Sequence, residues 1–91
     1  MTRILVKGSE IAVPSSVGAA SSFSEATVVR LANASTTDYV VTIAENNGGS
    51  ATIGTFTMLA NTSELVEKNP TNVVFVNSGS DVKGTKVGFT N

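Results

Sequence analysis

The chain has 91 residues, a formal net charge of −1, and no histidine, cysteine or tryptophan. This length allows one domain, because a second core would need roughly another hundred residues, and the missing residue types exclude disulfides, the commonest zinc ligands, a thiolate nucleophile and a histidine general base. The six basic and seven acidic residues are dispersed, which argues against nucleic acid as a partner, and no apolar run approaches the roughly 18 residues of a membrane span.

The first 25 residues differ in composition from the rest of the chain. Ile4 to Lys7 predicts a short strand, and the stretch from Gly8 to Glu25 is rich in Ser, Ala and Gly and contains Pro14. Such a stretch is either an edge strand with a loop on its own domain or an arm that becomes ordered on a partner. We therefore divide the sequence into an N-terminal strand and arm, residues 1–25, and a core domain, residues 26–91. The start is too poor in apolar residues for a secretory signal, so we expect no export.

Four side chains of the N-terminal segment are the candidates for contact with a partner: Val13, Pro14, Val17 and Phe23. Phe23 stands among serines, outside any strand-like run. Its ring either fills a pocket on a partner, as the aromatic anchors of interfaces do, or packs on the sheet of its own domain.

From Ala26 onward, β-branched runs alternate with clusters of Asn, Gly and Ser, which is typical of strands and turns. The runs cover residues 26–33, 39–45, 51–59, 64–68, 73–77 and 85–90, and with residues 4–7 they predict about seven strands. The polar residues 33–38 predict a connection that supplies its own side-chain hydrogen bonds, and residues 46–50 predict a hairpin. Within 39–45, alternation puts Tyr39, Val41 and Ile43 on one face, which we take as the core face.

Helical periodicity is weak throughout the chain. No window repeats apolar residues at helical spacing for three turns, and only residues 63–69 could form a single helical turn. Short strands spaced about ten residues apart are typical of an all-β sandwich or a small barrel. We expect the sandwich, small and antiparallel, with an immunoglobulin-like or jelly-roll-like arrangement.

Serine and threonine are abundant, but a hydroxyl nucleophile needs a neighbouring base. The lysines that could take this part are Lys7, Lys68, Lys83 and Lys86. Each also has a simpler interpretation as a solvated lysine at a strand edge, where it blocks aggregation. We therefore expect no catalytic residue.

The acidic residues form no pair or cluster that would bind a metal ion or transfer protons. Glu64 and Glu67 are separated by an odd number of positions, so a strand sends them to opposite faces. Asp38, Glu45 and Asp81 each stand alone, whereas a calcium site needs several oxygen ligands in one loop. We expect no metal, no cofactor and no enzymatic activity.

Several short runs of the sequence are similar to runs in a known group of proteins. They are Val28–Ser35, Val40–Ile43, Ile53–Met58, Leu65–Lys68, Val73–Phe75 and Thr85–Phe89. From Thr27 onward, over about two-thirds of the chain, the sequence resembles small virion-associated proteins of marine tailed bacteriophages, particularly those that infect cyanobacteria.

The resemblance implies a structural protein of the virion, a decoration or cement protein on the capsid surface after assembly in the host cytoplasm. The expected partners are the major capsid protein and further copies of the chain itself, without nucleic acid or membrane. The alternative is a recognition module of a phage tail or fibre that binds carbohydrate or a host surface through the loops at 46–50 and 77–80.

Overall fold

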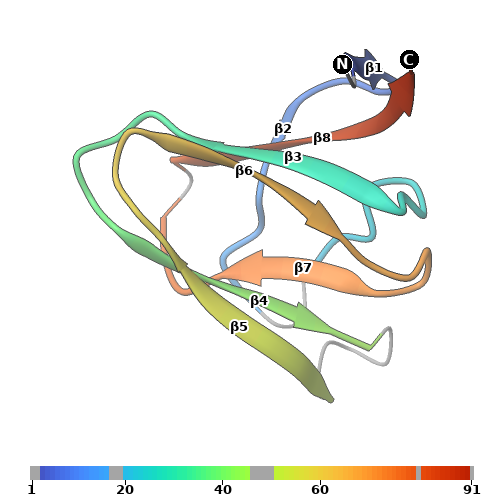
Figure 1. The fold of residues 1–91 in the computed structure, drawn as a ribbon. Coiled ribbons are helices and arrows are strands. Elements are labelled where there is room, and N and C mark those ends of the chain that lie inside the picture. Colours follow the sequence, from blue (N-terminus) through green and yellow to red (C-terminus); the bar gives the residue numbers. More distant parts are fainter. Residues whose placement is uncertain (1–2, 17–19, 46–50, 80, 91) are drawn as a thin grey trace.

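The computed structural model describes residues 3–16, 20–45, 51–79 and 81–90, and every regular element in these ranges is a β-strand. The strands are β1 (Arg3–Val6), β2 (Ile11–Ala12), β3 (Val28–Asn33), β4 (Tyr39–Ala44), β5 (Thr52–Met58), β6 (Thr62–Glu67), β7 (Val73–Val76) and β8 (Val82–Thr90) (Figure 1). The expected all-β class is confirmed. None of the described ranges forms a helix with the length and hydrophobicity of a membrane span.

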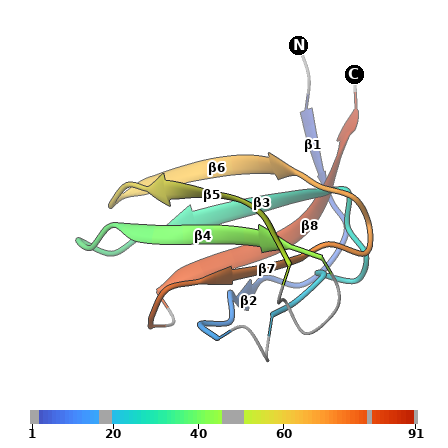
Figure 2. The same ribbon diagram turned by 90° about the horizontal axis from the view of Figure 1, so that it is seen from below.

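The strands form two antiparallel sheets that face each other as the layers of a sandwich (Figure 1, Figure 2). The five-stranded sheet has the order β1-β8-β3-β6, with β2 also paired to β8, and the three-stranded sheet has the order β5-β4-β7. All the pairs are antiparallel. The small antiparallel sandwich predicted from the sequence is therefore confirmed.

Each of the seven predicted strands is present, and β2 is an additional one. The segment 63–69, for which a helical turn was the alternative, begins instead with the last residues of β6. β4 and β5 pair as the predicted hairpin requires, whereas its turn at residues 46–50 lies outside the described residues.

The core lies between the two sheets and takes side chains from both. Tyr39 and Val41 of β4 are buried in it, and Ile43 packs against it, which confirms the predicted core face. The remaining buried members are Val13, Phe23, Ala26, Val29, Leu31, Met58, Val74, Val76 and Val82.

The connection from β3 to β4 is held by its own polar side chains, as its composition predicts. Asn33 is only 1% exposed, and its Nδ2 donates to the carbonyl oxygens of Thr37 at 2.8 Å and Leu59 at 3.4 Å. Its Oδ1 accepts from the backbone N of Ser35 at 3.1 Å and from the Ser35 hydroxyl at 2.7 Å. One buried amide thus links this connection to the end of β5.

The N-terminal segment is built into the sandwich and lies along one flank of it (Figure 2). β1 and β2 pair with β8, and the N–H of Val13 donates to Val82 O at 2.8 Å. The chain then passes to the other sheet, where Val76 N donates to Pro14 O at 2.9 Å and Ser21 forms a bridge with Val74. The described residues of the segment 1–25 therefore pair with β8 in one sheet and with β7 in the other.

β1 and the end of β8 project beyond the two layers as a ribbon (Figure 2). Its apolar side chains are consequently open to solvent on both faces: Ile4 is 42% exposed, Leu5 49% and Val6 66%.

Candidate functional site

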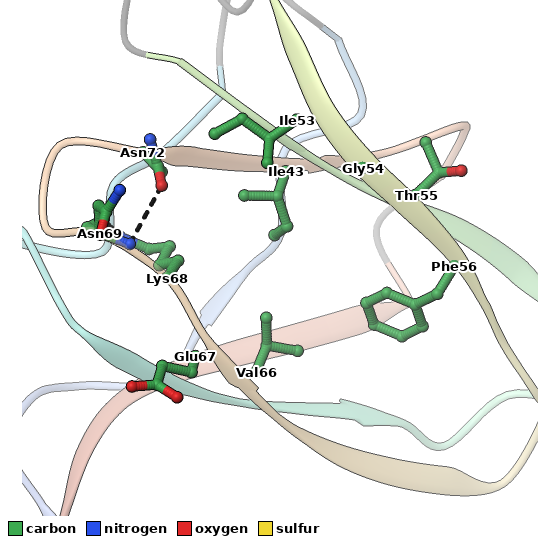
Figure 3. Close-up of a pocket in the computed structure, with 10 residues that line it drawn as sticks. All are labelled: Ile43, Ile53, Gly54, Thr55, Phe56, Val66, Glu67, Lys68, Asn69 and Asn72. Carbon is green, nitrogen blue, oxygen red and sulfur yellow. Dashed lines mark hydrogen bonds between the residues drawn. The ribbon is translucent and has the colours of Figure 1, made fainter.

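The flank opposite the N-terminal segment is open. β5 is the outer strand of one sheet and β6 the outer strand of the other, and neither has a strand partner on its outer side among the described residues. A groove of about 530 Å³ lies between them, and Figure 3 shows Phe56 of β5 and Val66 of β6 on facing sides of it. This groove is the candidate functional site.

The walls of the groove are apolar because they continue the core to the surface. Phe56, Val66 and Ile43 are partly buried and pack against the core cluster, whereas Ile53 is 55% exposed. Ile43 pairs with Gly54 and Ala44 pairs with Thr52, so Ile53 is the extra residue of a β-bulge. A bulge turns a side chain away from the regular alternation of its strand, and here it brings an isoleucine to the rim of the groove.

Lys68 closes one end of the groove. Its Nζ donates to the carbonyl oxygens of Ala26 at 2.7 Å, Asn69 at 3.3 Å and Pro70 at 3.4 Å, and the residue is 7% exposed. Burial lowers the pKa of the ammonium below its usual value, because desolvation disfavours the charged form. The interpretation of Lys68 as a solvated edge lysine is therefore wrong.

The reason lies in the position of Lys68 at the end of β6. It follows Val66 by two residues, so the alternation of the strand directs it to the core side. Its ammonium group donates to main-chain oxygens of Ala26, before β3, and of Asn69 and Pro70 in the next turn. That turn is fixed by Asn72, whose Oδ1 accepts from Asn69 N at 3.0 Å.

The chemistry of the groove follows from these contacts. The hydrogen bonds of the Lys68 ammonium are directed to main-chain carbonyls, and every buried side-chain nitrogen or oxygen in the described residues has a partner. The groove presents to a ligand the apolar side chains of Ile43, Ile53, Phe56 and Val66 between two strand edges, with polar side chains at the Lys68 end, among them Glu67, Asn69 and Asn72. Such a surface binds an extended segment through main-chain hydrogen bonds and alternate side chains.

The structure places the predicted partner-binding residues elsewhere. Val13 is 1% exposed and Phe23 5% exposed, and both belong to the core cluster. Pro14 is partly exposed next to β7, and Val17 lies outside the described residues. Of the two alternatives for Phe23, the structure shows packing on its own sheets, so neither Val13 nor Phe23 is available to a partner while the sandwich is intact.

The loop at 77–80, one of the two loops considered for recognition, is flanked by Asn77 and Asp81, and both of these residues contact β4. Asn77 Oδ1 accepts from Val40 N at 3.1 Å, and the Tyr39 hydroxyl donates to Asp81 Oδ2. This hydrogen bond, together with burial and the Asp81 charge, raises the pKa of Tyr39 above its usual value. The other loop, 46–50, lies outside the described residues.

Sequence reasoning missed the groove and the residues that border it. The available signal was the segment from Glu64 to Glu67, in which two aliphatic residues stand between two acids. An edge strand of a sheet often carries charges to prevent uncontrolled pairing, and the exposure of Leu65, 48%, shows that this strand also retains an apolar contact surface.

Comparisons with protein-family models, curated proteins and solved structures give no match for this chain. Within the described residues, no three acidic side chains lie close enough to hold a metal ion together.

Proposed function

We propose that this chain is a non-enzymatic structural protein of a bacteriophage particle, a decoration or cement protein that binds the shell of major capsid protein. The observation that carries the proposal is the open flank, where the outer strands of both sheets expose aliphatic side chains. Ile53 of β5 is 55% exposed and Leu65 of β6 is 48% exposed. Exposed aliphatic side chains on edge strands that lack a strand partner favour contact with another protein.

The remaining properties of the chain agree with this role. A decoration protein must bind at many symmetry-related places on the shell. A stable interface takes about 800 Å² from each partner, and the molecule has 5018 Å² of accessible surface. The contact must therefore extend beyond the groove, along the outer edge of β5. Strand addition supplies such a contact, because β5 has no strand partner on its outer side among the described residues.

Co-sedimentation with purified phage capsids tests this proposal. We expect the unmodified protein to sediment with the shells and Ile53→Asp to lose at least tenfold in affinity, because a carboxylate at the rim of the groove would have to be desolvated. Val40→Asp is the matched control: Val40 is 38% exposed on the neighbouring strand β4 and does not line the groove. Its binding should be unchanged.

Equal binding of the Ile53→Asp and Val40→Asp variants would remove the groove from the interface. Failure of the unmodified protein to bind shells, with a positive signal on a glycan array, would replace the proposal by the carbohydrate-recognition alternative.

A further inference from the structure

The five-stranded sheet ends in two strands of opposite charge. β1 continues into Lys7, and its aliphatic residues Ile4, Leu5 and Val6 are all exposed. β6 carries exposed Glu64 and Glu67 on either side of Leu65 and Val66. One free edge of the sheet is therefore apolar and basic, and the other is apolar and acidic.

We propose that copies of this chain associate head to tail, with β1 of one copy adding to β6 of the next, so that the five-stranded sheet continues from molecule to molecule. The occupant of the β6 edge is thus a second copy of the same chain. The experiment below is carried out without capsids, so its result is independent of the proposed function.

The directions of the strands agree with this arrangement. β1 is antiparallel to β8, β8 to β3, and β3 to β6. β1 and β6 therefore run in opposite directions within one molecule. When a second copy is displaced along the sheet without inversion, its β1 comes to lie antiparallel to the first copy's β6, which is the more stable pairing.

The faces of the two strands also agree. Leu31 and Val29 of β3 point into the core and are paired with Glu64 and Val66 of β6, so these two β6 residues lie on the core side of the sheet. On β8, Lys86 is paired with Val29. Gly88 lies two residues further on the same side.

Leu5 is paired with Gly88 and so shares the core side of the sheet. Lys7 follows Leu5 by two residues, and its side chain passes over Gly88, where an added Cβ would lie 2.9 Å from Lys7 Cε. Leu5 and Lys7 therefore face the same side of the continued sheet as Val66 and Glu64.

One register satisfies these side chains together. With Leu5 opposite Val66, antiparallel pairing puts Lys7 opposite Glu64 and, on the other face, Val6 opposite Leu65 and Ile4 opposite Glu67. Two of these pairs are aliphatic and one joins opposite charges, the kinds of cross-strand neighbours that stabilise a sheet, while the fourth places an aliphatic side chain against a carboxylate. Val66 lies on the wall of the groove across from Phe56 (Figure 3), so Leu5 of the incoming strand would cover the apolar opening.

Neighbouring registers are worse. A shift by one residue moves Leu5 to the opposite face, because side chains alternate. A shift by two residues places either Lys7 opposite Val66 or Leu5 opposite Glu64. The positions of Lys7 and Glu64 therefore select one register of β1 against β6, in addition to attracting the two copies to each other.

Sedimentation velocity over a range of protein concentrations tests the proposal with two charge reversals. We expect the unmodified protein to associate beyond a dimer as concentration rises, because a head-to-tail contact leaves a free edge on each end, and to dissociate as salt screens the charges. Lys7→Glu and Glu64→Lys should each weaken association at least tenfold. The control Glu45→Lys makes the same charge change as Glu64→Lys, but at an exposed position after β4. It should associate normally.

Mixing the two defective variants is the decisive measurement. The Lys7→Glu variant keeps its acidic β6 edge, which can pair with the basic β1 edge of the Glu64→Lys variant. The reversed β1 edge of the first variant is acidic and can pair with the reversed, basic β6 edge of the second. The mixture should therefore associate although each variant alone does not. Circular dichroism of each variant checks that the sandwich is intact. A monomeric unmodified protein at all concentrations, normal association of either charge-reversed variant, or no association on mixing would overturn the proposal.

Discussion

The ring of Phe23 occupies the space that a side chain at residue 84 would need: a Cβ on Gly84 would lie 2.6 Å from both Cε1 and Cζ of Phe23. This contact joins the N-terminal segment to the central strand β8. It also explains why a glycine stands within a strand, because only a residue without a side chain lets the ring approach the sheet so closely.

Replacement of Phe23 by alanine should lower the free energy of unfolding by about 3–5 kcal/mol, the usual cost of removing a buried aromatic side chain. Gly84→Ala alone should also destabilise the protein, because the ring must move away. The coupling is measured with Phe23→Leu, Gly84→Ala and the double variant that carries both changes. The smaller leucine side chain makes room for the alanine, so the double variant should lose less stability than the sum of the losses of these two single variants. Urea denaturation of the four proteins measures this coupling, and strict additivity would contradict the contact.

Deletion of residues 2–24 should unfold the domain. The sequence alone predicts the opposite, a folded core domain that has lost an arm. The structure shows that the deletion removes Val13 and Phe23 from the core and uncovers the outer edges of β7 and β8. Circular dichroism and thermal melting test this expectation, with Ile11→Ser as a control in the same segment. Ile11 is 46% exposed, so this change should cost about 0.5 kcal/mol or less.

Ser24→Gly should stabilise the protein by up to about 1 kcal/mol. The φ angles of Phe23, Ser24 and Glu25 are 54°, 57° and 57°, in the left-handed region that costs a residue with a Cβ about 1–2 kcal/mol. Glycine adopts this φ freely, although its greater entropy in the unfolded chain offsets part of the gain. Ser15→Gly, at an exposed position without a positive φ, should be neutral or slightly destabilising. A lower melting temperature for Ser24→Gly than for Ser15→Gly would contradict the strain.

Lys68→Met should lower the free energy of unfolding by about 1–3 kcal/mol, the cost of leaving a buried acceptor without its donor. The variant keeps an apolar stem of similar length but removes the proton donor of Ala26 O. Lys7→Met, which neutralises an exposed lysine, should change stability by about 0.5 kcal/mol or less when measured at low protein concentration. Equal effects of the two changes would show that the buried hydrogen bonds of Lys68 contribute nothing.

Tyr39 should titrate at a pH above its usual pKa of 10.0. The chain has one tyrosine, so the ultraviolet absorbance of tyrosinate follows this group directly. Because the hydrogen bond to Asp81 is the largest cause of the raised pKa, Asp81→Asn should move the midpoint down.

The same shift determines the sign of a stability effect at alkaline pH. A tyrosine whose pKa is raised on folding contributes stability that is fully present below pH 10.0 and is lost as the pH rises through the folded-state pKa. Tyr39→Phe should therefore show a smaller loss of stability over this range than the unmodified protein. A steeper alkaline loss for Tyr39→Phe would contradict the assignment.

The sequence predicts the strands well and the role of the N-terminal segment poorly, for a physical reason. Strands 39–45 and 73–77 are visible because β-branched residues and alternation are local properties. The paths of residues 11–16 and 20–25 depend on hydrogen bonds to β7 and β8, which lie far along the chain. The left-handed turn at 23–25 has no glycine to announce it, and the space that accepts Phe23 is made by Gly84, a residue that by itself indicates only a turn or a bulge.

The candidate site was less accessible to prediction than the fold. The groove exists because two outer strands from different sheets lie on the same open flank, and this relationship is set by the order of strands. The burial of Lys68 also cannot be predicted from the local sequence pattern. On its face of β6 it follows Glu64 and Val66, so a charged, an apolar and another charged residue share one side, and no alternation reveals that the last of them is buried.

β8 lies between β3 and the N-terminal strands, yet it follows all of them along the chain. During translation, β1 and β2 leave the ribosome long before the strand that they need, and β3 can reach only β6. The larger layer of the molecule is therefore completed only when residues 82–90 emerge, through contacts between distant parts of the chain, which form slowly. Until then the newly made protein exposes unpaired strand edges, which favour aggregation.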